Sequence, residues 1–314
     1  GVFTDGEHYD WVELHNNGKE SVDISGWGLS DKKEEPFLWQ FPENTVLKGG
    51  DYALVYCAGE EGLTDYPRRH VYHAPFKLPQ DGETIRLVDP SGDTVFKLKY
   101  EQQYGNVSYG LCADGETWGH FETATPRKAN GKKVYALQAE RPVIETKPGF
   151  YTLGKGETLQ VVLSGEGEIR YTVDGSEPTR DSKLYTGPIS LTKTTVVRAR
   201  TCDADKLMSY VEGATYIIND PSVVGVVSVS TDRKYLYDPA IGVFVRGNNE
   251  QSNYMYDWEY PMFFEYFDVN GERQLGQNVS FHITGTSTRG YSQKSFAVYA
   301  RDAYGDENRF YYNP

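Results

Sequence analysis

A loop near the C-terminus contains the side chains of this chain that are best suited to hold an anion. Residues 285–294 include two glycines, which let the backbone turn and approach a partner closely, and several hydroxyl donors. Arg289 and Lys294 lie in the same stretch, and both are cations of the kind that bind phosphate. The pattern predicts an anion site. The alternative is an ordinary loop in which Lys294 caps a strand and extends to water.

Strands on both sides must position this loop. Apolar and polar residues alternate at 279–283 and again at 296–300, which is typical of half-buried strands. The loop is therefore expected at the turn of a hairpin. Further strands are predicted at 223–229 and 261–267, and the second of these ends at an Asn270–Gly271 turn.

Composition predicts a mostly β protein with several domains. A chain of 314 residues has room for two or three domains. Helical periodicity is scarce, and turn signals recur at roughly 8–12-residue intervals, which favours two immunoglobulin-like β-sandwiches in series before an antiparallel β-rich end. The expected divisions are an antiparallel sandwich at 1–133 with a hairpin turn at 89–92, a linker at 134–141, a smaller sandwich at 142–220 with a strand at 195–201, and the C-terminal region at 221–314.

Charge and hydropathy exclude several partners. The net charge of −13 disfavours nucleic acid and anionic membranes, because phosphate-rich surfaces require a basic face. No apolar run reaches the roughly 18 residues of a membrane span, and no signal peptide is evident. The opening at Gly1 indicates a chain trimmed at its front.

Three cysteines give neither a disulfide framework nor a zinc motif, because none has Cys-x-x-Cys spacing. Cys57 and Cys112 could bridge each other. The alternative is that these two and Cys202 are buried free thiols.

Other residues suggest chemistry but have simpler interpretations. His70 and His73 have a metal-like spacing without a third ligand, so we expect exposed loop histidines and no metal site. Asp174 and Glu177 are explained by a turn and not as a glycosidase pair, and no catalytic residue is predicted. Two glycosylation-like sequences, Asn106-Val-Ser and Asn278-Val-Ser, are treated as chance.

Four tryptophans in the first region could stack on sugar rings. Trp27 lies in a Gly-Trp-Gly turn and Trp39 between two phenylalanines, so these two are expected in the core. Trp11 and Trp118 remain open to either interpretation.

Residues 1–133 resemble the lamin tail domain. The segments that carry the resemblance, in order, are Asp10-Trp-Val-Glu-Leu-His-Asn, Val22-Asp-Ile-Ser-Gly-Trp-Gly-Leu-Ser-Asp, Leu47-Lys-Gly-Gly-Asp-Tyr, Leu78-Pro-Gln-Asp-Gly-Glu-Thr-Ile-Arg-Leu-Val-Asp, Ser108-Tyr-Gly-Leu and Thr125-Pro-Arg-Lys-Ala-Asn. The resemblance implies an immunoglobulin-like binding or spacing module. It also implies a first strand before Gly1, whose loss would leave a sheet edge unpaired.

Residues 142–220 resemble the chitobiase/β-hexosaminidase C-terminal domain. The resemblance rests on Ile169-Arg-Tyr-Thr-Val-Asp-Gly-Ser-Glu-Pro-Thr, Leu184-Tyr, Gly187-Pro-Ile and Thr194-Thr-Val-Val-Arg-Ala. It implies an accessory β-sandwich, either facing a glycan or acting as a rigid spacer.

The last 90 or so residues are similar to the opening part of the spore-coat CotH kinase family. The shared segments are Tyr235-Leu-Tyr-Asp-Pro-Ala-Ile-Gly-Val-Phe-Val-Arg-Gly, Phe263-Phe-Glu-Tyr-Phe-Asp-Val-Asn-Gly, and Arg289 with Gln293-Lys-Ser-Phe. The family implies phosphoryl transfer from ATP to secreted protein, with Mg²⁺-binding carboxylates placed later than Pro314. On this resemblance Lys294 would neutralise nucleotide phosphates, assisted by Arg289 or Arg246, in the N-terminal part of a kinase-like lobe.

Two functions follow from these inferences. The first is a non-catalytic fragment of a secreted or cell-surface bacterial CotH-like kinase, with sandwiches that position a protein substrate, and with ATP and Mg²⁺ used only by the full-length protein. The second is an adhesive or spacer array on polysaccharide or cell wall. The C-terminal region is also expected to pack on the preceding sandwich or another molecule, or to be disordered near Pro314.

Overall fold

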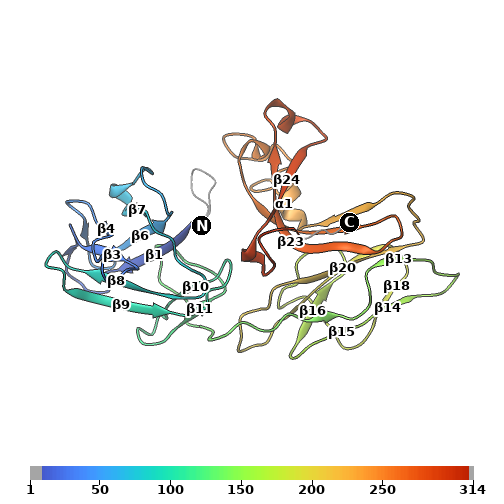
Figure 1. Ribbon diagram of the computed structural model, residues 1–314, viewed down its shortest axis with the longest axis horizontal. Helices are drawn as coiled ribbons and strands as arrows, with labels where there is room; N and C mark the ends of the chain where they lie inside the picture. The colour runs from blue at the N-terminus through green and yellow to red at the C-terminus, as the bar shows by residue number, and fades with distance from the viewer. Residues whose placement is uncertain (1–8, 311–314) are drawn as a thin grey trace. The chain divides into compact units, whose positions relative to one another are not determined.

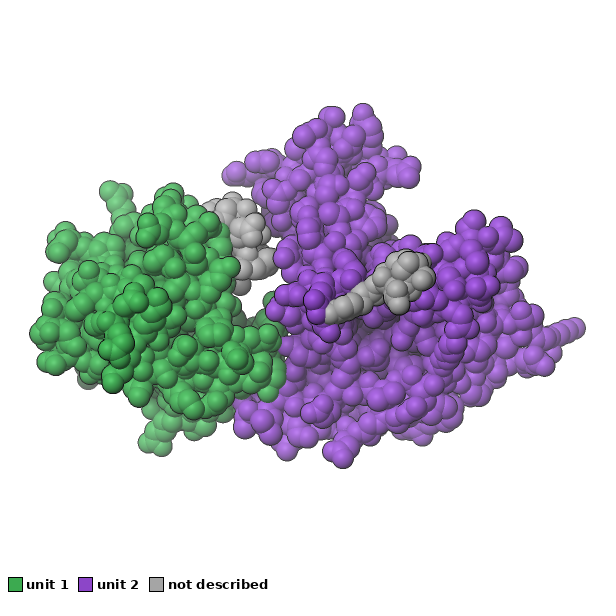
Figure 2. Space-filling model, viewed as in Figure 1, with its two compact units in different colours: residues 1–134 green, residues 135–314 purple. Residues whose placement is uncertain are grey.

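The computed structural model describes residues 9–310 and is built almost entirely from β-strands (Figure 1). It divides into two compact units, with unit 1 ending at Val134 and unit 2 beginning at Tyr135 (Figure 2). Unit 2 contains both the second predicted sandwich and the C-terminal region. The mostly β class predicted from the sequence is confirmed, and the kinase-like lobe stays a prediction. The strand expected before Gly1 and the order near Pro314 fall outside the described residues.

Unit 1 contains eleven described strands and one short turn of 3-10 helix. A three-stranded sheet runs β1-β6-β7, a four-stranded sheet runs β4-β3-β8-β9, and β2-β5 and β10-β11 form pairs. The elements are β1 (Asp10–His15), β2 (Val22–Asp23), β3 (Gly28–Ser30), β4 (Trp39–Gln40), β5 (Val46–Leu47), β6 (Tyr52–Cys57), η1 (Pro67–Arg69), β7 (Val71–Ala74), β8 (Glu83–Val88), β9 (Thr94–Tyr100), β10 (Ser108–Leu111) and β11 (Trp118–Phe121).

The pairing in unit 1 differs from the sequence prediction in one respect. The sandwich was expected to be antiparallel throughout, but β6 and β7 are parallel. Parallel neighbours need a crossover connection, and the long loop 58–70 with η1 supplies it. The Asp89–Gly92 hairpin turn between β8 and β9 forms as predicted, with Gly92 donating to the Asp89 carbonyl.

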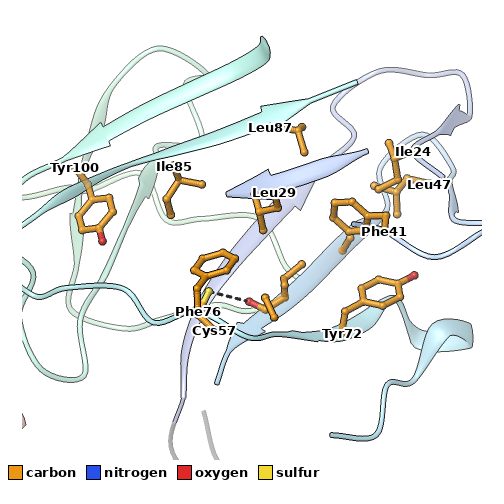
Figure 3. Close-up of a cluster of buried hydrophobic side chains, with 13 residues drawn as sticks. Ile24, Leu29, Phe41, Leu47, Cys57, Tyr72, Phe76, Ile85, Leu87 and Tyr100 are labelled. Carbon is orange, nitrogen blue, oxygen red and sulfur yellow. Dashed lines mark hydrogen bonds between the residues drawn. The ribbon is translucent and has the colours of Figure 1, made fainter. Parts of the chain in front are cut away.

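The core of unit 1 lies between its sheets and is apolar (Figure 3). Strand alternation explains its members, because Ala53, Val55 and Cys57 on β6 point inward at every second position. Phe41 and Tyr72 pack edge to face, with ring centroids 5.6 Å apart.

All three cysteines are buried free thiols, so the alternative without a disulfide is confirmed. Within the core, the Cys57 Sγ lies 4.0 Å from the Val55 carbonyl oxygen.

Unit 2 begins with a small sandwich. Its five-stranded sheet runs β13-β20-β19-β16-β17, accompanied by the pairs β12-β15 and β14-β18. The strands are β12 (Val143–Ile144), β13 (Gly149–Tyr151), β14 (Leu159–Val161), β15 (Leu163–Ser164), β16 (Ile169–Thr172), β17 (Lys183–Leu184), β18 (Ile189–Leu191), β19 (Thr195–Thr201) and β20 (Glu212–Ile218). The turn at Asp174 forms as predicted, since its carboxylate accepts bonds from the Ser176 N–H and hydroxyl.

A four-stranded antiparallel sheet, β21-β22-β23-β24, completes unit 2. Its elements are β21 (Val226–Ser230), α1 (Arg233–Tyr237), η2 (Asn253–Met255), β22 (Tyr260–Phe267), β23 (Arg273–Thr284), η3 (Ser287–Gly290), β24 (Ser295–Ala300) and η4 (Asp302–Tyr304). Residues on α1 and the following loop cover one end of an outer apolar cluster that includes Met262, Phe281 and Ile283. The predicted turn at Asn270–Gly271 joins β22 to β23, with Gly271 at φ +78°.

The four-stranded sheet packs on β19 and β20 of the small sandwich. Strand β20 is buried on both faces: Ala214, Tyr216 and Ile218 enter the sandwich core, while Thr215 faces the C-terminal sheet. The expectation that the C-terminal region packs on the preceding sandwich is therefore met within unit 2. We call this contact surface the seam. Its polar members are Arg198, Thr215, Glu265, Arg273, Asn278 and Asp306.

Candidate functional site

The hydroxyl-rich loop lies at the turn between β23 and β24, where Thr284 pairs with Ser295. The turn η3 forms most of the loop, and Gly285 precedes it at φ +99°, which a residue with a Cβ rarely adopts. A hollow open to solvent lies beside the loop. Its lining residues are Thr288, Tyr291, Ser292, Gln293, Lys294 and Ser295.

The Arg289 side chain binds its own protein. Its Nη2 donates to Asp257 Oδ1 at 2.6 Å, its Nη1 to the Met255 carbonyl at 3.2 Å and its Nε to the Gly285 carbonyl at 2.8 Å. These bonds tie the loop to the segment that follows η2. An anion would have to compete with the Asp257 carboxylate for this guanidinium, so the predicted role of Arg289 stays a prediction.

The Lys294 ammonium group lies beside the hollow and binds the loop backbone. Its Nζ donates to the carbonyls of Arg289 at 2.6 Å and Tyr291 at 3.0 Å, and lies 4.1 Å from the centre of the Tyr254 ring. Partial burial lowers the Lys294 pKa, and the neighbouring Tyr254 opposes this shift. Two of its three protons are therefore used locally, as in the strand-capping alternative, and anion binding by Lys294 stays a prediction.

Arg246 lies outside this loop, in the segment between α1 and η2. The residue is exposed, and its backbone carbonyl accepts a bond from the Asn253 N–H at 2.8 Å. Arg289 and Lys294 share the loop, where the Lys294 Nζ donates to the Arg289 carbonyl. The phosphate-binding role of all three residues stays a prediction.

A second candidate surface is a group of aromatic side chains on unit 1, which we call the aromatic strip: Phe96 on β9, Tyr109 on β10 and Trp118 on β11. The Trp118 ring lies 6.3 Å from Phe96 at an interplanar angle of 28°, and 5.8 Å from Tyr109 at 32°. Phe96 is 45% exposed and Trp118 38% exposed. The strip therefore presents Phe96 and Trp118 to solvent, while the similarly inclined Tyr109 ring is partly buried and packs against the core of unit 1.

The other tryptophans of unit 1 serve the packing. Trp27 and Trp39 pack against the buried core, which confirms the prediction for both. Trp11 packs on a smaller cluster formed by Leu54, Tyr56 and Val71. Trp118 is thus the tryptophan of this unit that is available for stacking on a partner.

The prediction of an exposed loop histidine is wrong for His73. Its side chain is only 5% exposed, because it lies on β7, where its ring stacks on Tyr56 with centroids 5.8 Å apart. Its Nδ1 lies 3.2 Å from Asp65 Oδ1, so the ring is held by a carboxylate. His70 ends η1 with φ +51° and its Nδ1 lies 3.4 Å from the Tyr72 hydroxyl.

The described residues contain neither a metal-binding cluster nor a membrane-spanning helix. No group of three or more His, Cys, Asp or Glu side chains is placed to hold a metal ion within residues 9–310. In the same residues, no helix combines the length and apolar character needed to cross a membrane.

The seam was not predicted from the sequence, and it contains the two deeply buried charged side chains Arg198 and Glu265. Arg198 is almost fully buried and donates from Nη2 to Asn278 Oδ1 at 2.9 Å, and its guanidinium lies 5.0 Å from the centre of the Phe263 ring. Glu265 is fully buried and accepts bonds from the Thr215 hydroxyl and, at 3.2 Å, from Arg273 Nη1. Burial raises the pKa of Glu265, and these donors oppose the shift.

A signal for the seam was present in the sequence. Arg198 lies between apolar residues of a predicted strand, and Glu265 interrupts a run of aromatic residues. Charges at such positions need buried partners. Asn278 belongs to the same network: its Nδ2 donates to Asp306 Oδ2 and to the Val211 carbonyl, each at 2.8 Å. Its side chain is therefore not free to carry a glycan.

Comparison with known proteins shows that two stretches of this chain are similar to known domain families. No match was found among the curated proteins. No match to the CotH kinase family was found for the C-terminal region. Residues 2–102 match the family model of the Lamin Tail Domain, and residues 146–212 match that of the chitobiase/β-hexosaminidase C-terminal domain.

Proposed function

We propose that this chain is a non-catalytic binding and positioning array that faces a neutral polysaccharide. Unit 1 supplies the contact surface, and unit 2 acts as a stiff spacer. The observation that carries this proposal is the aromatic strip, with two of its rings more than one-third exposed. The domain types matched by the two units support a binding or spacing role.

The geometry of the strip favours sugar rings as ligands. A pyranose ring has a face of C–H groups that can lie flat on an aromatic ring, with weak C–H contacts and exclusion of water. The planes of Phe96 and Tyr109 lie within about a third of a right angle of the Trp118 plane. Successive sugars of one chain could therefore stack on neighbouring rings without large rotations between them.

Charge favours a neutral polymer over an anionic one. The chain has a net charge of −13, so an anionic cell-wall polymer would be repelled at low ionic strength. A neutral polysaccharide meets no such barrier. The match of residues 146–212 to a chitobiase/β-hexosaminidase C-terminal domain supports a carbohydrate setting for the same chain.

Depletion binding on insoluble chitin and cellulose tests this proposal. The intact chain is expected to bind at least one of them, and Trp118→Ala to weaken binding roughly fivefold, since loss of one stacked aromatic ring costs about 1 kcal/mol. Tyr237→Ala removes an equally exposed ring from unit 2 and serves as the matched control. Equal binding by Trp118→Ala and the parent chain would reject the strip as the contact surface.

A second candidate function rests on the position of Lys294 beside its hollow. In this proposal the C-terminal region is the front part of a CotH-like phosphotransferase, secreted or displayed on a bacterial surface, and the two sandwiches hold it near a protein substrate. The loop that carries Lys294 would bind the phosphates of ATP, and further residues of the full-length protein would supply the carboxylates that hold Mg²⁺. The local bonds of Lys294 and Arg289 mean that the loop would have to reorganise when phosphate enters.

Calorimetric titration of the chain with ATP and Mg²⁺ tests the second candidate. Lys294→Ala should abolish the heat of binding, while Lys193→Ala, which removes an exposed lysine from the small sandwich, should leave it unchanged. Binding that survives Lys294→Ala would remove this lysine from the candidate site.

A further inference from the structure

Strand β21 forms one edge of the C-terminal sheet. It pairs with β22 from Val226 opposite Phe267 to Ser230 opposite Phe263. Within residues 9–310, no strand pairs with its other side. Backbone N–H and C=O groups along such an edge are a template for another strand, and most proteins protect their edges against this.

Charged residues lie in or directly beside three other edge strands of the described residues. Strand β9 includes Lys97 and Lys99, β1 includes Asp10 and Glu13, and β24 is flanked by basic residues on both sides. The segment 221–231 around β21 contains no charged residue. Its only proline stands before the strand, where it does not interrupt the edge.

Exposed valine side chains also make this edge apolar. Val227 is 55% exposed and Val229 is 44% exposed, and both point to the face of the sheet that is turned away from the seam. The cross-strand neighbours on this face are Tyr266 and Phe264. Ahead of the strand, Val223 is 93% exposed. Solvent therefore meets a row of β-branched side chains beside unpaired backbone.

We propose that β21 pairs antiparallel with β21 of a second copy of this chain, about a two-fold axis at Ser228. Residues opposite each other in a sheet point to the same face. Val227 and Val229 of both copies therefore lie on one face only if each odd-numbered residue of one copy is opposite an odd-numbered residue of the other. Centring on Ser228 places Val227 opposite Val229 of the other copy, and Val226 opposite Ser230. The sequence is self-complementary in this register, as a symmetric contact requires.

The contact is small, which sets the expected affinity. One strand pair with its side chains buries less than the roughly 800 Å² per partner of a standard interface, so we expect dissociation constants in the micromolar range. The two copies would join their C-terminal sheets into one of eight strands. A surface-bound array would gain from this pairing, because two linked copies bind a repeating polymer more tightly than one.

Sedimentation equilibrium across the micromolar range tests the pairing on the intact chain. The parent chain should shift from monomer to dimer as concentration rises. A double variant, Val227→Lys with Val229→Lys, places lysines directly opposite lysines in the proposed register and should remain monomeric. The matching double glutamate variant should also remain monomeric, and mixing the two should restore a dimer through Lys–Glu pairs.

Val95→Lys provides the matched control. Val95 is a similarly exposed valine on the edge strand β9, and this change should leave the dimer intact. Circular dichroism will establish that all variants keep their fold, as expected for lysines on an exposed edge. Three results would each overturn the proposal. The parent chain could stay monomeric at about 200 micromolar, well above the expected dissociation constant. The double lysine variant could still dimerise, or the mixture of lysine and glutamate variants could fail to associate.

Discussion

The core of unit 1 and the seam of unit 2 both hold sheets together, but they do so with different chemistry. The core of unit 1 is apolar and includes Phe41, Tyr72 and Leu29. The seam buries Arg198 and Glu265 and joins them to partners by hydrogen bonds. Apolar packing tolerates exchange among side chains of similar volume, whereas a buried polar network depends on each donor and acceptor.

The largest expected effect is in the core of unit 1. Phe41→Ala should destabilise this unit by about 4 kcal/mol, because it removes a large buried ring and leaves a cavity. In calorimetry of the intact chain, the transition of unit 1 should fall by roughly 10 °C or more, while that of unit 2 stays in place. Val22→Ala, at an exposed position, is the control and should change little.

A change that leaves no cavity should separate the two regions more sharply. Asn278→Leu should destabilise unit 2 by about 3 kcal/mol, because Arg198, Asp306 and the Val211 carbonyl lose their partner. Leu29→Met in the core of unit 1 should cost less than about 1.5 kcal/mol. Similar losses in both variants would contradict the contrast between core and seam.

The pH dependence of unit 2 provides a third test. The folded-state pKa of Glu265 is raised above the ordinary 4.5 by burial, so its contribution to stability is full below pH 4.5 and is lost as the pH rises through the folded pKa. Glu265→Gln cannot titrate. The stability of the parent relative to this variant should therefore decline as the pH increases from 4.5 in urea unfolding. A constant difference would show that Glu265 keeps an ordinary pKa.

The smallest effect is expected at the loop. Lys294→Met keeps most of the side-chain stem but removes the ammonium group that binds the carbonyls of Arg289 and Tyr291. We expect a loss of about 1 kcal/mol or less and faster proteolysis within 285–294. Lys193→Met is the exposed control. Unchanged cleavage would mean that Lys294 does not hold the loop.

Local pattern was enough to predict most strands and several turns. The hairpin of β23 and β24, the Asp174 turn and the core positions of Trp27 and Trp39 follow from alternation and turn chemistry over a few residues. The parallel pairing of β7 with β6 was not predicted, because the sequence of the connecting loop does not specify the direction in which the next strand pairs. The burial of His73 was missed for the same reason.

The candidate sites show the same limit. The sequence pattern placed Lys294 and Arg289 on one loop. It did not predict that Arg289 would bind the Asp257 carboxylate or that Lys294 would bind backbone carbonyls. It offered four tryptophans for stacking without distinguishing Trp118 from the buried ones. Those differences depend on residues that are distant in the chain and adjacent only after folding.

By itself, the sequence determined that this protein is mostly β, which segments alternate as strands, and which two domain families its first two regions resemble, because these follow from short-range periodicity and ordered motifs. Only the tertiary structure decided that β20 is buried on both faces, that Arg198 and Glu265 are enclosed in a seam, and that β21 has an uncharged edge with which no other strand of residues 9–310 pairs. Burial and pairing are properties of segments brought together from different parts of the chain, and no local pattern specifies which surface will meet which.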